Sequence, residues 1–313
     1  MNYVEQEIVV QGAADEGPGA GVRISGDIFR QIERTVKPCV SMALTGRSGR
    51  VGQPPKWLQA ACNVRVLGFS RRDSDLVLNL ASPTLGDAAP RVFEQVSLWE
   101  DSVRSDETAL ELMGKLVSDV RAQQANSDSY DEPMLTRLTG WEGLLETRVK
   151  SMILPGRLQG QSPVLDQDVI TGAKALNSRI PVPRQVRLVG TVDMVRHSTR
   201  SLGLRLEGGE EIRCAVVDEN LSHLGDLLGR EVTLLGKAIY RPSGAVLRLD
   251  VEGILDTVAG RAQYSKVPLS FDRRQPSDTP LQNARSGVAT IIGTWPGDET
   301  DDELVAALAE IHR

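Results

Sequence analysis

The strongest constraint on the fold is a regular alternation of apolar and polar residues in the second half of the chain. A period of two predicts β-strands with one face turned inward. Five segments follow this pattern: 185–198, 201–209, 211–217, 230–240 and 245–255. A short helix over 218–229, ending at Gly229, is expected between the third and fourth strands. Inward positions are predicted for Val186, Leu188, Val192, Leu202, Leu204, Leu206, Ile212, Cys214 and Val216.

The order strand, strand, strand, helix, strand, strand resembles that of the OB-fold, a small five-stranded barrel. Gly190 and Gly236 fall in the middle of the first and fourth predicted strands, where such a barrel must bend sharply. The sequence therefore predicts an OB-like barrel over 184–257.

The N-terminal half mixes strand and helix signals. A hairpin is predicted over 63–83, around the turn residues RRDSD. A short strand and a helix are expected before Pro38, which should end the helix, and 39–46 alternates like a strand. Further helices are expected over 90–101, 105–124 and 134–149, the last with Gly140 as a weak point. These elements predict an α+β fold, an antiparallel sheet packed by helices.

The domain organisation follows from these patterns. We expect a flexible lead over 1–21, an α+β domain over 22–155, a connector over 156–183 and the barrel over 184–257. The remaining segments are a polar, proline-bearing linker over 258–288 and a tail over 289–313 that carries a tethered C-terminal helix.

Composition argues against several classes of protein. The formal net charge of -6 and pI near 5.3 do not favour a general nucleic-acid binder. The three cysteines are widely spaced and form no CxxC pair, which favours a reducing, cytoplasmic setting. The sequence has no apolar run long enough for a membrane span, and MNYVEQEIVV does not resemble a signal peptide. We therefore expect a cytoplasmic protein without a membrane partner.

Motifs of catalysis are missing from the sequence. The GxSxG, P-loop and GxGxxG patterns do not occur, and His197 and His223 have no ligand partners at metal spacing. The expectation is a non-enzymatic protein with no catalytic residue, no cofactor and no metal.

Nucleic-acid binding by the barrel is the alternative function. Arg187, Arg196 and Arg200 could form a modest basic patch for contact with a phosphate backbone. The outward positions of the second and third predicted strands, however, carry no aromatic side chain on which a base could stack. These positions are Ser201, Gly203, Arg205, Glu207, Arg213 and Ala215.

The end of the chain has the features of a binding segment. Thr300 and Glu303 form a T-x-x-E capping box, which predicts the start of a short helix. Leu304, Leu308 and Ile311 follow at helical spacing on one face. A helix this short is marginal alone in water, so its apolar face needs a partner surface. An apolar anchor followed by an amphipathic helix on a tether is typical of a helix-in-groove ligand.

The stretch IIGTWPGDETDDELVAALAEI resembles the C-terminal tails of small bacterial antitoxins that neutralise PIN-domain ribonuclease toxins. In that family the tail wraps the toxin and blocks its active site. The resemblance implies contact with a toxin, encoded nearby, by Ile292, Trp295, Pro296, Asp298, Glu299, Leu304 and Leu308, and the shared helix face adds Ile311.

The rest of the chain departs from that family. Those antitoxins are usually short and begin with a dimeric DNA-binding domain, whereas this chain carries two larger domains. Toxin sequestration is therefore expected and operator binding is not. The sequence leaves open the oligomeric state, the ligand of the N-terminal domain, and whether the tail docks on a partner or on its own chain.

Overall fold

The computed structural model describes residues 2–12, 22–49, 53–93, 103–156, 162–216 and 224–255. All of these belong to one compact unit, Met1–Arg273. The predicted linker and the predicted tail with its helix lie outside the described residues.

An α+β part comes first in the chain and a barrel follows it, as the sequence predicted. The strands of the α+β part are β1 (Tyr3–Gln11), β2 (Arg65–Arg72), β3 (Asp75–Pro83), β4 (Ser151–Ile153) and β5 (Val164–Leu165). Its helices are α1 (Val22–Thr45), α2 (Lys56–Ala61), α3 (Leu85–Ala88), α4 (Pro90–Phe93), α5 (Ala109–Arg121), α6 (Glu132–Thr139), α7 (Glu142–Thr147) and α8 (Gln167–Arg179).

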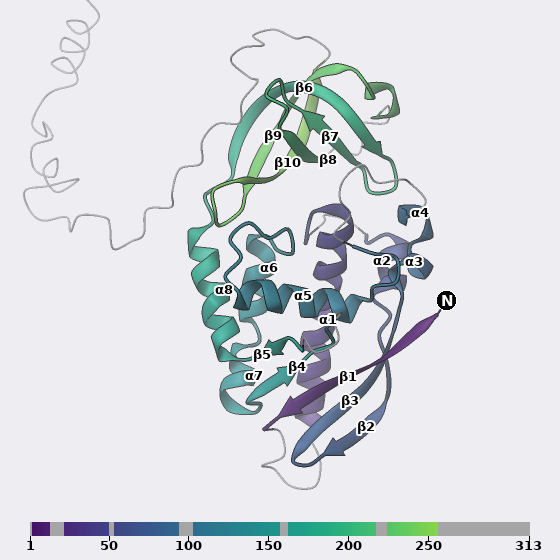
Figure 1. Ribbon diagram of the computed structural model, residues 1–313, viewed down its shortest axis with the longest axis vertical. Coiled ribbons are helices and arrows are strands. Elements are labelled where there is room, and N and C mark those ends of the chain that lie inside the picture. Colours follow the sequence, from purple (N-terminus) through teal and green to yellow (C-terminus); the bar gives the residue numbers. More distant parts are fainter. Residues whose placement is uncertain are drawn as a thin grey trace, which may run out of the picture. The chain divides into compact units, whose positions relative to one another are not determined.

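The sheet of the α+β part is antiparallel, with strand order β2-β3-β1-β4-β5. Figure 1 shows β2, β3 and β1 side by side. Ile8 pairs with Leu78 and Val10 with Leu76, and all four side chains are buried. Directly opposed residues share a face of the sheet, so these pairs build one apolar face that packs into the core. The predicted hairpin over 63–83 is confirmed as β2 and β3.

The prediction of a flexible lead over 1–21 is wrong for its first residues. Tyr3–Gln11 forms β1, which pairs with β3 on one side and β4 on the other. Strand β4 lies far along the chain from β1. Because β4 pairs with the free edge of β1, the mixed polar and apolar segment 3–11 becomes a central strand of the sheet.

Helix α1 continues through Pro38, which corrects the prediction that the helix ends there and that 39–46 is a strand. The buried side chains recur every fourth residue on both sides of the proline, at Ile28, Ile32, Val36, Val40 and Leu44. An interior proline costs about 3 kcal/mol in a helix. Burial of one large aliphatic side chain recovers about 1.5–3 kcal/mol. The unbroken apolar stripe therefore offsets the cost of Pro38.

The predicted connector over 156–183 contains structure and belongs to the α+β part. Helix α8 begins at the cap residue Asp166, whose carboxylate accepts a hydrogen bond from the Val169 amide at 3.2 Å. The helix buries its apolar face in the same core as α1 and α5. This helix was not predicted from the sequence, because its first turn is polar and many of its side chains are exposed.

The barrel strands are β6 (Arg184–Arg196), β7 (Ser201–Arg205), β8 (Glu211–Val216), β9 (Glu231–Tyr240) and β10 (Val246–Leu255). They close in the order β10-β8-β7-β6-β9, with β10 parallel to β8 and the other pairs antiparallel. A short 3-10 helix (Leu224–Leu227) lies between β8 and β9. This arrangement is OB-like, and the residues predicted to face inward form the barrel core.

Two glycines allow the barrel strands to approach one another closely. A Cβ at Gly236 would lie 2.2 Å from the backbone oxygen of Asp250, and a Cβ at Gly190 would lie 2.6 Å from that of Arg205. Both distances are far below a non-bonded contact, so no other residue fits without a shift of the backbone. The expectation that the barrel needs these glycines for its curvature is consistent with this crowding.

Replacing Gly236 by alanine should lower the free energy of unfolding by about 1–3 kcal/mol, because the added methyl group overpacks against a backbone carbonyl. Urea unfolding measures the change. Gly208→Ala is the matched control, since Gly208 lies in an exposed turn with open space around its Cβ position. Equal stabilities of the two variants would contradict the role given to Gly236.

Candidate functional site

The residues predicted to bind a partner all lie outside the part of the chain that the structure describes. They are Ile292, Trp295, Pro296, Asp298, Glu299, Leu304, Leu308 and Ile311. Their role therefore stays a prediction.

The three arginines of the nucleic-acid alternative occupy different settings. Arg187 is exposed near the start of β6, and Arg196 is buried at the end of the same strand, with 8% of its surface exposed. Arg200 is half-buried in the turn after β6, with φ of 54°. Arg196 lies nine positions after Arg187 on β6, about 30 Å along an extended strand.

The outer face of β7 and β8 is largely buried, and one of its residues contacts the C-terminal end of α1. Ser201, Gly203 and Ala215, which the sequence placed outward, are buried, and Arg213 donates a hydrogen bond to the backbone oxygen of Leu44 at 3.2 Å. OB-folds commonly use this face for single-stranded nucleic acids. Here Arg213, one residue of that face, contacts the end of α1.

A cavity of about 340 Å³ lies where these two parts meet. Its charged lining is balanced in sign and comes from both parts: Asp128, Arg196, Glu210, Glu211, Arg213 and Arg241. Apolar side chains such as Met42, Val92 and Met194 complete the wall. The volume falls within the range of small-molecule sites.

The charged groups of the cavity also connect the two parts. Arg241 of the barrel donates to the carboxylate of Asp128 through two guanidinium nitrogens, one of them at 3.1 Å. The neighbouring Ser243 amide donates to the backbone oxygen of Ala125 at 3.3 Å. The cavity wall is therefore held in place by the same residues that would meet a ligand.

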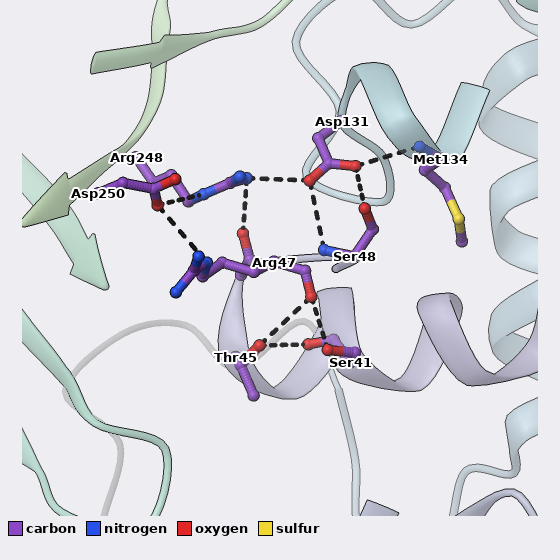
Figure 2. A network of polar contacts seen from close by, with 9 residues as sticks. Ser41, Thr45, Arg47, Ser48, Asp131, Met134, Arg248 and Asp250 are labelled. Carbon is purple, nitrogen blue, oxygen red and sulfur yellow. Dashed lines mark hydrogen bonds and ion pairs between the residues drawn. The ribbon is translucent and has the colours of Figure 1, made fainter. Parts of the chain in front are cut away.

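A buried ion pair connects the barrel with the α+β part next to the cavity (Figure 2). The guanidinium of Arg248 on β10 lies 3.1 Å from the carboxylate of Asp131, and their side chains are 8% and 1% exposed. Arg248 also donates to the backbone oxygen of Gly46 at 3.0 Å and to Asp250 at 2.9 Å. These contacts satisfy most of the donors of Arg248, as a buried charge requires.

Asp131 collects hydrogen bonds from three segments. Its carboxylate accepts from the hydroxyl of Ser48 at 2.5 Å and from the amide of Met134 at 3.2 Å, where it caps α6. Arg47, the residue before Ser48, lies 3.6 Å from Asp250 of the barrel. The loop after α1, the start of α6 and strand β10 therefore meet at one carboxylate (Figure 2).

This network was not predicted from the sequence. Asp131 has the sequence signal of a helix cap, because it precedes Glu132 and Pro133 at the start of a helix. No linear signal connects it with Arg248, 117 residues later. Arg47 lies in a glycine- and proline-containing stretch of the sequence, and the structure places it against the barrel.

The thiols are protonated at neutral pH. Burial raises the pKa of Cys39 and of Cys214, and burial raises the pKa of Cys62 to about 12 despite the nearby Lys37. A nucleophilic cysteine requires the thiolate form, so these thiols are poorly suited to nucleophilic catalysis.

Two further properties concern the described residues alone. No group of three His, Cys, Asp or Glu side chains lies close enough to hold a metal ion. Among the described helices, none combines the length and apolarity needed to cross a lipid bilayer.

Comparison of the chain with protein-family models, curated proteins and solved structures found no match.

Arg248→Met should lower the free energy of unfolding by about 3–5 kcal/mol, because it leaves the carboxylate of Asp131 buried without its counter-charge. Urea unfolding measures the loss. The double variant Asp131→Asn with Arg248→Met should recover part of it, since asparagine still caps α6 without a charge.

Arg72→Met is the matched control for this experiment. Arg72 pairs with Glu7 at 2.8 Å, but both side chains are about half exposed or more. Its removal should cost no more than about 1 kcal/mol. If Arg248→Met costs no more than this control, the ion pair does not hold the two parts together.

We predict that the protein loses stability in alkali, because its thiols have a higher pKa in the folded state than in the unfolded chain. An unfolded thiol ionises near its ordinary pKa of 9.0, whereas folded Cys62 holds its proton to about 12. The stabilising effect of the Cys62 thiol is complete below about pH 9 and is lost as the pH rises through about 12. At pH 8 the folded Cys62 should react with a disulfide reagent about a thousandfold more slowly than in urea, because its thiolate fraction is lower. Rapid reaction of Cys62 in the folded protein would contradict its burial.

Proposed function

We propose that this chain is a non-enzymatic interaction protein whose C-terminal tail, 289–313, binds and occludes a partner protein. The tail sequence is the observation that carries the proposal: Trp295, an acidic capping segment and an apolar helix face follow one another within a few residues. Such a segment gains its stability by burying apolar surface against a groove.

The two described cores are built from separate parts of the chain. The barrel closes with five of its own strands, and its core residues and their packing neighbours come from 186–254. The core of the α+β part and its packing neighbours come from residues 8–180.

The resemblance to antitoxin tails suggests the class of partner. A PIN-type ribonuclease toxin has an acidic active site, and occlusion of that site by the tail would be a steric mechanism of inhibition. Trp295 would be the anchor, because burial of an indole removes about 150–250 Å² from water. Leu304, Leu308 and Ile311 would then pack along a groove of the toxin.

The alternative function, binding of single-stranded nucleic acid by the barrel, has weaker support. The outer face of β7 and β8 contacts α1, and Arg187 and Arg196 lie far apart along β6. Binding that falls steeply with salt and with Arg187→Ala would favour this alternative.

Co-purification of the full chain with the ribonuclease-like product of a neighbouring gene tests the proposal. Trp295→Ala should weaken the complex about 30-fold or more, as expected for a buried aromatic anchor. Leu228→Ala is the control, because Leu228 is a 58% exposed apolar residue of the barrel. A chain that ends at residue 286 should neither bind the ribonuclease nor inhibit it, and retained binding by that chain would refute the proposal.

A further inference from the structure

A second concave surface, here called the basic groove, lies along α1. It shares no described lining residue with the cavity between the barrel and the α+β part. It has a volume of about 540 Å³. Its described lining residues are Arg30, Glu33, Arg34, Lys37, Pro38, Ser41, Ser48, Gly49, Pro54, Pro55, Leu58 and Arg137. Four of these are cations and one is an acid, although the chain as a whole carries a net charge of -6.

The cations of the basic groove form an ordered array. Arg30, Arg34 and Lys37 follow one another at helical spacing on one face of α1, over a length of about 10 Å. Arg137 of α6 joins them from a second helix. All four side chains are exposed.

Three of these cations form no ion pair with a described residue, although Glu33 lies beside them in the lining of the groove. Arg30 pairs with Asp27 at 2.9 Å. Within the described ranges, Arg34, Lys37 and Arg137 form no ion pair and no side-chain hydrogen bond. Like charges held this close repel one another, so an anion that enters the groove relieves the repulsion as well as gaining contacts.

The two helices that carry the cations are held together firmly. Gln31 of α1 donates to the backbone oxygen of Gly140 at 2.8 Å, and the indole of Trp141 donates to Thr35 at 3.0 Å. Trp141 and Thr35 are buried. The backbone positions of Arg34 and Arg137 are thus preorganised, which lowers the entropy cost of binding.

The remaining lining of the basic groove combines prolines and Leu58 with Ser41, Ser48 and Gly49. Pro54 and Pro55 precede α2, and Leu58 lies in its first turn. The hydroxyls of Ser41 and Ser48 are already used, since they donate to the oxygen of Arg47 at 2.7 Å and to Asp131 at 2.5 Å. The groove therefore offers a ligand two chemistries, cationic and apolar.

We infer that the basic groove binds a nucleotide, with its phosphates on Arg34, Lys37 and Arg137 and the face of its base against Pro54 and Pro55. Guanidinium groups match the geometry of phosphate oxygens and bind them through paired hydrogen bonds. The volume of the groove suits a ligand of this size. This site is separate from the tail of the proposed function, and its test does not depend on a protein partner.

Isothermal titration of the full chain with a nucleoside triphosphate tests the inference. The double variant Arg34→Gln with Arg137→Gln should weaken binding at least tenfold, because each guanidinium contributes charge-assisted hydrogen bonds. Arg71→Gln with Arg91→Gln is the matched control, since it removes two exposed positive charges elsewhere on the α+β part. Both double variants change the net charge equally, so only a local effect separates them.

Two further titrations examine the chemistry of the ligand. Tripolyphosphate should bind more weakly than the nucleoside triphosphate, because it lacks a group for the apolar wall. Equal affinity would overturn the nucleotide assignment, as would tight binding of a short single strand with no binding of the triphosphate. The inference also fails if no triphosphate binding is measured or if the groove variant and the control variant bind alike.

Discussion

The buried ion pair between Asp131 and Arg248 is the interaction on which the arrangement of the described residues depends. Its two charges lie in the interior, where each would be costly without the other. Asp131 caps α6 and accepts a hydrogen bond from Ser48. These contacts hold the loop after α1 against the start of α6 without any contribution from the barrel. The pairing of Arg248 with Asp131 also positions β10, so that Asp250 lies close to Arg47.

This junction changes what the barrel can do. The OB-like strand order would suggest a ligand on the outer face of the second and third strands. In this chain Arg213 on that face contacts the end of α1, and the cavity beside it is lined by charged groups of both parts. The fold alone therefore does not carry its usual function here, since function depends on the surface that remains accessible.

Helix α1 links the main features of the molecule. One face supplies the stripe from Ile28 to Leu44 to the core, and its C-terminal end meets the barrel. A further face presents Arg30, Arg34 and Lys37 to the basic groove. Because Pro38 does not end the helix, the residues before and after it are held in one rigid element, and the groove and the junction share a common support.

The local sequence pattern was sufficient to predict the barrel, but it was not sufficient to predict the candidate sites. The barrel follows from strand alternation, the residues predicted to face inward, and the glycines at 190 and 236, since each of these depends on neighbours within a few residues. The β2–β3 hairpin and the break near Gly140 were predictable for the same reason. The role of β1, the continuation of α1 through Pro38, the pairing of Asp131 with Arg248 and the gathering of Arg34 with Arg137 were not. Each of these depends on contacts between segments far apart in the chain, whose energies appear only when the core brings them together.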